Sequence, residues 1–116
     1  MRSVGDVGEA IAEKYLISKG AKILARNYTI RGGEIDLIAE LNETILFVEV
    51  KLRRSEMFGS AYESITPAKQ KHLSRAAKIY LQKNGLLDKR FARFDAILIL
   101  PDGTIDHIER AFDYIG

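Results

Sequence analysis

The fold of this chain is decided by two neighbouring stretches, Gly33-Glu34-Ile35-Asp36-Leu37-Ile38-Ala39 and Thr44-Ile45-Leu46-Phe47-Val48-Glu49-Val50-Lys51. Both are rich in β-branched and large apolar residues and alternate in polarity, which predicts two adjacent strands over about 34–41 and 44–53. Asn42 and Glu43 separate them and predict a two-residue hairpin loop. Leu41 then pairs with Thr44, and counting outwards along both strands brings Asp36 opposite Glu49 and Glu34 opposite Lys51.

This register predicts a pair of carboxylates on neighbouring strands, with Cβ atoms about 4.5–5.5 Å apart. Facing carboxylates repel unless a cation or a proton lies between them. Hard oxygen ligands suit Mg²⁺ or Mn²⁺, and Lys51, on the same face as Glu49, could orient a water or neutralise developing negative charge. The alternative is a surface hairpin with an ordinary Glu–Lys pair. The apolar strand and the facing Asp36 favour the metal site, because unpaired charge is costly to bury.

The spacing of the acids resembles a known signature. Asp36, followed after twelve residues by Glu49-Val50-Lys51, is similar to the motif of the PD-(D/E)XK nucleases. With Gly8-Glu9 and residues 31–39, 47–53 and 65–70, the chain resembles the YraN-type family of uncharacterised bacterial proteins, which is similar in fold to archaeal Holliday junction resolvases. The resemblance covers essentially the whole chain. Ile35 stands where the superfamily name has proline, but that proline is not a ligand.

The resemblance implies an α/β, restriction-endonuclease-like fold, with a mixed central β-sheet flanked by helices in a single PD-(D/E)XK nuclease-like domain over residues 1–116. It implies that Asp36 and Glu49 hold Mg²⁺ (or Mn²⁺), with the Val50 carbonyl as a further ligand and Lys51 positioning the water. Glu34 is an alternative extra acid on the Asp36 face.

Glu9 lies on a helix predicted over about 4–20. Periodicity alone places Glu9 at the edge of the apolar stripe of this helix, where a solvated glutamate is the simpler interpretation. Resolvase-like nucleases, however, carry a helix-borne glutamate that joins the metal site, and Glu9 is the matching position. The resemblance therefore implies that Glu9 completes the metal shell.

Gln70 lies in the first turn of a second helix, predicted over about 67–84. Thr66 suits the N-cap and Pro67 the first helical position. From this turn the Gln70 side chain could reach the site or cap the backbone. Similar nucleases place a glutamine on this helix.

Charge is unevenly divided along the chain. Residues 51–93 carry 11 Lys/Arg and 3 Asp/Glu, whereas residues 1–50 carry 6 and 8, and residues 94–116 carry 1 and 5. Such clustering is typical of a protein that binds a phosphate backbone, although a solvated helix face gives the same pattern. The polar stretch 54–64 is predicted as a loop over the substrate. The expected nucleic-acid-binding residues are Arg53, Arg54, Lys71, Arg75 and Lys78.

The composition of the chain excludes several kinds of site and several classes of protein. The chain has no cysteine, which excludes disulfides and zinc–thiolate sites, and His72 and His107 lie too far apart to suggest a histidine metal site. No apolar stretch approaches the length of a membrane span and no signal-peptide pattern is visible, so a cytoplasmic protein without a membrane partner is expected. Further strands are predicted over about 22–29, 93–100 and 104–111.

Two functions from different classes follow from this sequence. The first is a metal-dependent endonuclease that hydrolyses phosphodiester bonds in DNA, with branched or junction DNA among its substrates. A homodimer would be needed to cut both strands of a junction symmetrically. The alternative is a non-catalytic nucleic-acid-binding or scaffold protein that retains the nuclease fold.

Overall fold

The computed structural model describes residues 4–52 and 65–115. Arg53, Arg54 and the predicted loop 54–64 lie outside the described residues. All of the predicted helices and strands are present, with ends that differ by no more than two residues from the predicted ones. In chain order the elements are α1 (Val4–Ser18), β1 (Lys22–Ile30), β2 (Gly33–Leu41), β3 (Thr44–Leu52), α3 (Pro67–Lys83), β4 (Phe91–Ile99) and β5 (Ile105–Phe112).

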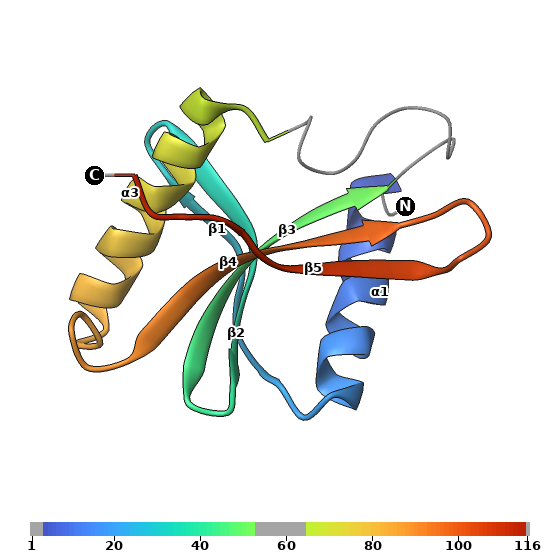
Figure 1. Ribbon diagram of the computed structural model, residues 1–116, viewed down its shortest axis with the longest axis horizontal. Helices are drawn as coiled ribbons and strands as arrows, with labels where there is room; N and C mark the ends of the chain where they lie inside the picture. The colour runs from blue at the N-terminus through green and yellow to red at the C-terminus, as the bar shows by residue number, and fades with distance from the viewer. Residues whose placement is uncertain (1–3, 53–64, 116) are drawn as a thin grey trace.

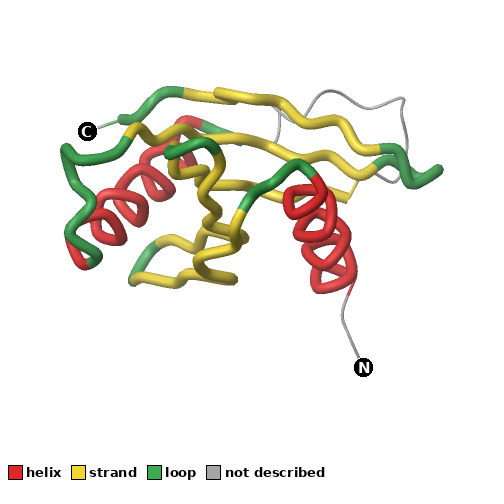
Figure 2. Tube along the Cα trace, turned by 90° about the horizontal axis from the view of Figure 1, so that it is seen from below, coloured by secondary structure: helices red, strands yellow, loops and turns green. Residues whose placement is uncertain are grey.

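In the described part of the chain, the strands form one five-stranded sheet in the order β1-β2-β3-β4-β5. Only β3 and β4 run parallel, so the sheet is mixed. Figure 1 shows α3 and α1 on either side of the strands, and Figure 2 shows the twisted strands passing between them. Along β3, Phe47 packs into the core beneath α3, whereas Leu46 and Val48 pack into the core beneath α1. The predicted α/β architecture, with helices flanking a mixed sheet, is therefore confirmed.

The hairpin between β2 and β3 has the predicted loop. Asn42 and Glu43 have φ values of 50° and 65°, the left-handed conformation that a type I′ turn requires at both central residues. Leu41 pairs with Thr44, and the predicted register continues as far as the pair Leu37–Val48. The turn therefore sets the register of the two strands that carry the candidate site.

Beyond that pair, the expectation that Asp36 lies directly opposite Glu49 and Glu34 opposite Lys51 is wrong in detail, because the β2–β3 ladder ends at Leu37. The Asp36 carboxylate instead accepts a hydrogen bond of 2.8 Å from the backbone N–H of Val50. Where β2 and β3 diverge, the Asp36 side chain thus takes the place of a backbone carbonyl as the acceptor for the Val50 N–H.

The cause lies in an irregularity of β2. Ile35 and Ile38 both pack into the core beneath α3, whereas Leu37 and Ala39 pack into the core beneath α1. In a regular strand, residues 35 and 37 would share a face, so the alternation slips by one position around Asp36. Such irregularities re-aim a side chain, and here the residue concerned is the first acid of the candidate site.

A buried polar network connects α1 to strands β4 and β5. Asp95 on β4 is fully buried, and its carboxylate lies 2.7 Å from Nε2 of His107 on β5 and 3.1 Å from Nε of Arg93. Nδ1 of His107 forms a 2.9 Å hydrogen bond with the hydroxyl of Tyr15 on α1. His107 thus has an acidic partner that its neighbours in the sequence do not reveal. The network helps to position the helix that carries Glu9.

Neither helix in the described residues is long and apolar enough to cross a membrane.

Candidate active site

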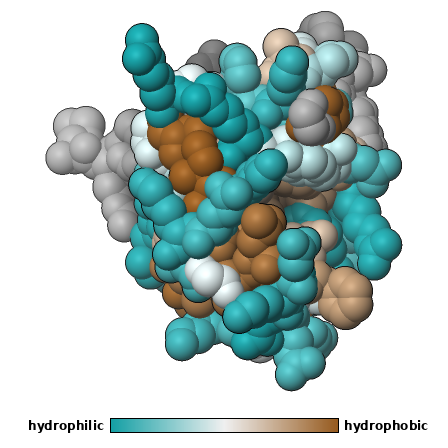
Figure 3. Space-filling model, turned by 90° about the vertical axis from the view of Figure 1, so that its left-hand side faces the viewer, coloured by the Kyte–Doolittle hydropathy of each residue, from teal (hydrophilic) through white to brown (hydrophobic). Residues whose placement is uncertain are grey.

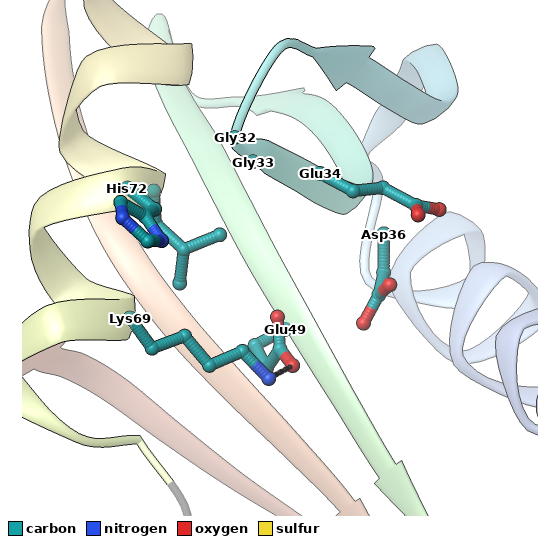
Figure 4. Close-up of a pocket in the computed structure, with 8 residues that line it drawn as sticks. Gly32, Gly33, Glu34, Asp36, Glu49, Lys69 and His72 are labelled. Carbon is teal, nitrogen blue, oxygen red and sulfur yellow. Dashed lines mark hydrogen bonds and ion pairs between the residues drawn. The ribbon is translucent and has the colours of Figure 1, made fainter.

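A cavity of about 260 Å³ lies between the diverging ends of β2 and β3 and the first turns of α3. Figure 4 shows the side chains around it. The lining residues are Gly32, Gly33, Glu34, Asp36, Glu49, Lys69, His72 and Leu73. The cavity therefore brings together both acids of the predicted motif and a lysine from a distant part of the chain.

Glu49 is the most buried acid of the site, with 6% of its surface exposed. Its Oε1 atom lies 2.5 Å from Nζ of Lys69 and 3.4 Å from Nζ of Lys51. Two ammonium groups therefore share one carboxylate oxygen. Their charges offset the cost of burying the Glu49 carboxylate.

Lys69 was not among the residues predicted for the site. The Thr66 side chain caps the start of α3 by accepting a hydrogen bond from the backbone N–H of Lys69, and Pro67 occupies the first turn as expected. Lys69 precedes Leu73, a buried residue of the helix, by four positions and so lies on its inward face. The four-residue spacing between Lys69 and Leu73 is the feature of the sequence that could have placed Lys69 on the inward face of the helix. In Figure 4, the Lys69 side chain extends from α3 towards Glu49.

Gln70, which was considered for the site, hydrogen-bonds to the backbone next to the start of α3. Its Nε2 donates a 2.9 Å hydrogen bond to the carbonyl oxygen of Ile65, just before the helix. Gln70 is also absent from the lining of the cavity.

Asp36 carries the clearest electrostatic signature. Burial and, next, the charge of Glu49 raise the pKa of Asp36 from 3.8 to about 7, with smaller contributions from Glu9 and Glu34. The hydrogen bond from the Val50 N–H acts in the opposite direction. The protein fold thus leaves Asp36 short of positive charge, whereas Glu49 has two lysines.

Asn27 on β1 connects the remaining two acids. Its Nδ2 donates to Oε1 of Glu9 at 2.7 Å and to Oε1 of Glu34 at 3.2 Å. Asn27 has a φ of 49°, a conformation that asparagine tolerates better than most residues. In Figure 4, the Glu34 side chain points away from Lys69, and the Asp36 carboxylate lies on the far side of Glu49 from Lys69. From periodicity alone, Glu9 was interpreted as a solvated residue. The sequence did not reveal that Glu9 contacts Asn27.

The close approach of α1 and α3 to the strands depends on two glycines. A Cβ atom on Gly8 would lie 3.0 Å from Cγ of Leu52, and a Cβ atom on Gly33 would lie 3.0 Å from the backbone oxygen of His72. Both helices can therefore approach the strand ends that carry the acids.

The donor chemistry fits a hard divalent cation. Asp36, Glu49 and Glu9 offer carboxylate oxygens and Val50 a backbone carbonyl, the ligands that Mg²⁺ and Mn²⁺ prefer. The raised pKa of Asp36 and the ammonium of Lys69 on Glu49 both indicate a site that requires positive charge. As they stand, the described residues contain no group of three His, Cys, Asp or Glu side chains that could hold a metal ion. Binding would therefore require these side chains to move.

The exposed side of α3 carries the predicted basic residues. Lys71, Arg75 and Lys78 are all exposed. Figure 3 views the molecule from this side and shows hydrophilic side chains around smaller apolar patches. Two other basic residues in the stretch 51–93 have acidic partners. Arg90 pairs with Glu40, and Arg93 pairs with Asp95 and Glu109.

Among solved structures, the fold is similar to that of Hjc from Archaeoglobus fulgidus, a Holliday junction resolvase from an archaeal hyperthermophile. The TM-score is 0.51 at 21% sequence identity, over 92% of this chain and 73% of that one. This similarity confirms the restriction-endonuclease-like fold.

Relatives at higher identity span nearly the whole chain. A UPF0102 protein of Geotalea uraniireducens is 45% identical, with 97% of this chain and 91% of the relative covered. A second, from Clostridioides difficile, is 46% identical, with 93% and 95% covered. The profile of the Uncharacterised protein family UPF0102 matches residues 8–99. The chain therefore belongs to the Uncharacterised protein family UPF0102, and the expected resemblance to a family of uncharacterised proteins is confirmed.

Proposed function

We propose that this protein is a metal-dependent endonuclease that hydrolyses phosphodiester bonds in DNA, with branched or junction DNA as the first substrate class to test. The observation that carries the proposal is the convergence of Asp36 and Glu49, from adjacent strands, on one cavity that also holds a lysine. The resolvase described for the similar fold supports the choice of junction DNA. Residues 1–116 would act as one nuclease-like domain.

The two acids have complementary environments. Glu49 has two lysine ammonium groups beside it, whereas burial and the neighbouring acids raise the pKa of Asp36 to about 7, which a bound cation would lower again. Asp36, Glu49, Glu9 and the Val50 carbonyl would hold Mg²⁺ or Mn²⁺. When bound, this ion would polarise the phosphate and lower the pKa of a water molecule.

Lys51 is the proposed catalytic lysine. Its ammonium lies 3.4 Å from Glu49, and 31% of its side chain is exposed, so it stands where the buried acid meets solvent. At this position it can orient the attacking water or neutralise negative charge on the phosphate. Glu34 is exposed and held by Asn27, and it remains an alternative acid for the site.

The basic side of α3 is the proposed contact surface for the nucleic-acid backbone. Lys71, Arg75 and Lys78 face solvent on the same helix that supplies Lys69 to the cavity. Arg53 and Arg54 directly follow β3 in the sequence and are proposed to join them. Contacts of this kind position a duplex without reading its bases. Symmetric cutting of a junction would bring two copies of the protein together.

The test is a cleavage assay on four-way junctions, flaps, linear duplexes, single strands and RNA, each with MgCl₂, MnCl₂ or EDTA. We expect metal-dependent cleavage of at least one DNA substrate and loss of that cleavage in Lys51→Ala. Binding of the same DNA without cleavage under any metal condition would instead support the non-catalytic nucleic-acid-binding or scaffold alternative.

A further inference from the structure

Lys69 occupies a position that conflicts with a metal ion on Glu49. Its Nζ lies 2.5 Å from Oε1, closer than the 3.4 Å of Lys51, although it comes from a helix twenty residues further along the chain. A divalent ion on either oxygen of this carboxylate would lie within a few ångström of the Lys69 ammonium. At that range the repulsion between two cations in a partly buried site is large compared with thermal energy.

The surroundings also restrict where Lys69 can move. Its side chain is anchored on the first turn of α3, which is fixed by the Thr66 cap. Among the described residues that line the cavity, the acids are Glu49, Asp36 and Glu34. Glu34 already accepts a hydrogen bond from Asn27. Once a metal ion has taken Asp36 and Glu49, these described cavity residues leave no free acid for the Lys69 ammonium, and a phosphate of the substrate would be available to pair with it.

We infer that Lys69 is an exchangeable cation of the site, which pairs with Glu49 in the metal-free protein and with a phosphate of the nucleic acid once a divalent metal is bound. This inference rests on the proposed function for its metal site. It assigns Lys69 two opposite effects, because the same ammonium weakens metal binding and strengthens metal-dependent DNA binding. An ordinary structural ion pair would also weaken metal binding, but it would not strengthen metal-dependent DNA binding.

The first measurement is calorimetric titration of the full chain with MnCl₂. We expect Lys69→Met to bind Mn²⁺ roughly tenfold more tightly than the wild type, because one competing charge is removed from a partly buried site. Lys69→Arg keeps the charge and should bind like the wild type. Lys83→Met, on the last turn of the same helix, matches the change in net charge and should also bind like the wild type.

The second measurement is fluorescence anisotropy with a labelled four-way junction and a labelled duplex, in CaCl₂ or in EDTA. We expect Lys69→Met to bind DNA several-fold more weakly than the wild type in CaCl₂ and equally well in EDTA, where Glu49 holds Lys69. If Lys69→Met does not fold, Glu49→Gln provides the test, because it releases Lys69 and should raise DNA affinity in EDTA more than Glu34→Gln does.

Each arm decides the inference independently of cleavage. Unchanged or weaker Mn²⁺ binding by Lys69→Met, or equal loss of DNA affinity with and without metal, overturns it. So does equal DNA affinity of Glu49→Gln and Glu34→Gln in EDTA. A wild type that cuts no substrate but behaves as expected in both arms would refute the nuclease and leave the exchange of Lys69 standing. If the wild type cuts DNA but Lys69→Met shows no gain in metal affinity, the proposed nuclease activity stands and the exchange of Lys69 is refuted.

Discussion

Replacing Asp36 by asparagine should stabilise the metal-free protein above neutral pH. Burial and the neighbouring acids raise the pKa of Asp36 from 3.8 to about 7. Between these two values the native state holds a proton that the unfolded state has released, so the free energy of unfolding falls as pH rises and then stays level above about pH 7. A carboxyl group whose folded pKa is raised thus destabilises the fold at high pH.

The shift sets the magnitude. A shift of about three pKa units, at 1.36 kcal/mol per unit, lowers the free energy of unfolding by about 4 kcal/mol at about pH 8, where Asp36 is ionised, and by about 2 kcal/mol at about pH 5, where the native state still holds the proton. The asparagine side chain carries no charge at any pH. We therefore expect Asp36→Asn to gain up to about 4 kcal/mol over the wild type at the higher pH, with a gain that shrinks towards zero as the solution is acidified.

The asparagine is chosen because of the Val50 hydrogen bond. The amide oxygen of an asparagine can still accept from the Val50 N–H, whereas alanine would leave that donor unpaired. Asp36→Ala is therefore the matched control, and it should be less stable than Asp36→Asn by about 1–3 kcal/mol.

Urea denaturation in EDTA across this pH range measures the gain, and the same titration with MgCl₂ measures the metal effect. Mg²⁺ should stabilise the wild type through linkage and leave Asp36→Asn unchanged. The reasoning fails if Asp36→Asn is markedly less stable than the wild type in EDTA at about pH 8, or if the difference does not depend on pH. Asp36 would then be a structural hydrogen-bond acceptor.

Three further results are expected. Lys51→Ala should abolish cleavage while calorimetry with Mn²⁺ shows that metal binding is retained, because Lys51 is not a ligand, and an equal loss of affinity in Lys51→Ala and Asp36→Ala would contradict this. Gly33→Ala should lower the free energy of unfolding by about 1–3 kcal/mol in urea titrations, because its Cβ would lie 3.0 Å from the His72 carbonyl oxygen, and an unchanged midpoint would contradict this close approach. Reversal of three basic residues to glutamate should weaken DNA binding and flatten its dependence on salt, and unchanged binding at low salt would show that this face is merely solvated. The three residues are Lys71, Arg75 and Lys78.

The hairpin could be predicted because its signals are local. Asn42 and Glu43 lie directly between two alternating strands, and the left-handed turn that they form sets the register as far as Leu37 and Val48. Beyond those residues the prediction failed. The slip around Asp36 appears only in the way Ile35 and its neighbours divide between the two cores, which depends on how both helices pack.

The partners of the site residues were harder to predict for a related reason. Lys69 reaches Glu49 only because α3 crosses close to β2 at Gly33, and no local pattern contains that approach. Gln70, one position later, differs from Lys69 in the direction in which its side chain leaves the helix. His107 meets Asp95 across the β4–β5 pair, where the register shifts between Phe94 and Ala96. Each of these contacts depends on tertiary geometry.

The order of the strands along the chain also bears on how the protein folds. The β2–β3 hairpin is local, and hairpins form in about 1–10 μs, whereas the parallel pairing of β3 with β4 must wait for the long connection that contains α3. We therefore expect Asp36 and Glu49 to approach each other before Lys69 can dock, so that their repulsion would oppose folding as well as lower stability. We expect stopped-flow refolding to be faster for Asp36→Asn than for the wild type at about pH 8, with the two rates converging in acid. Equal rates at both pH values would mean that the acids meet only after the rate-limiting step.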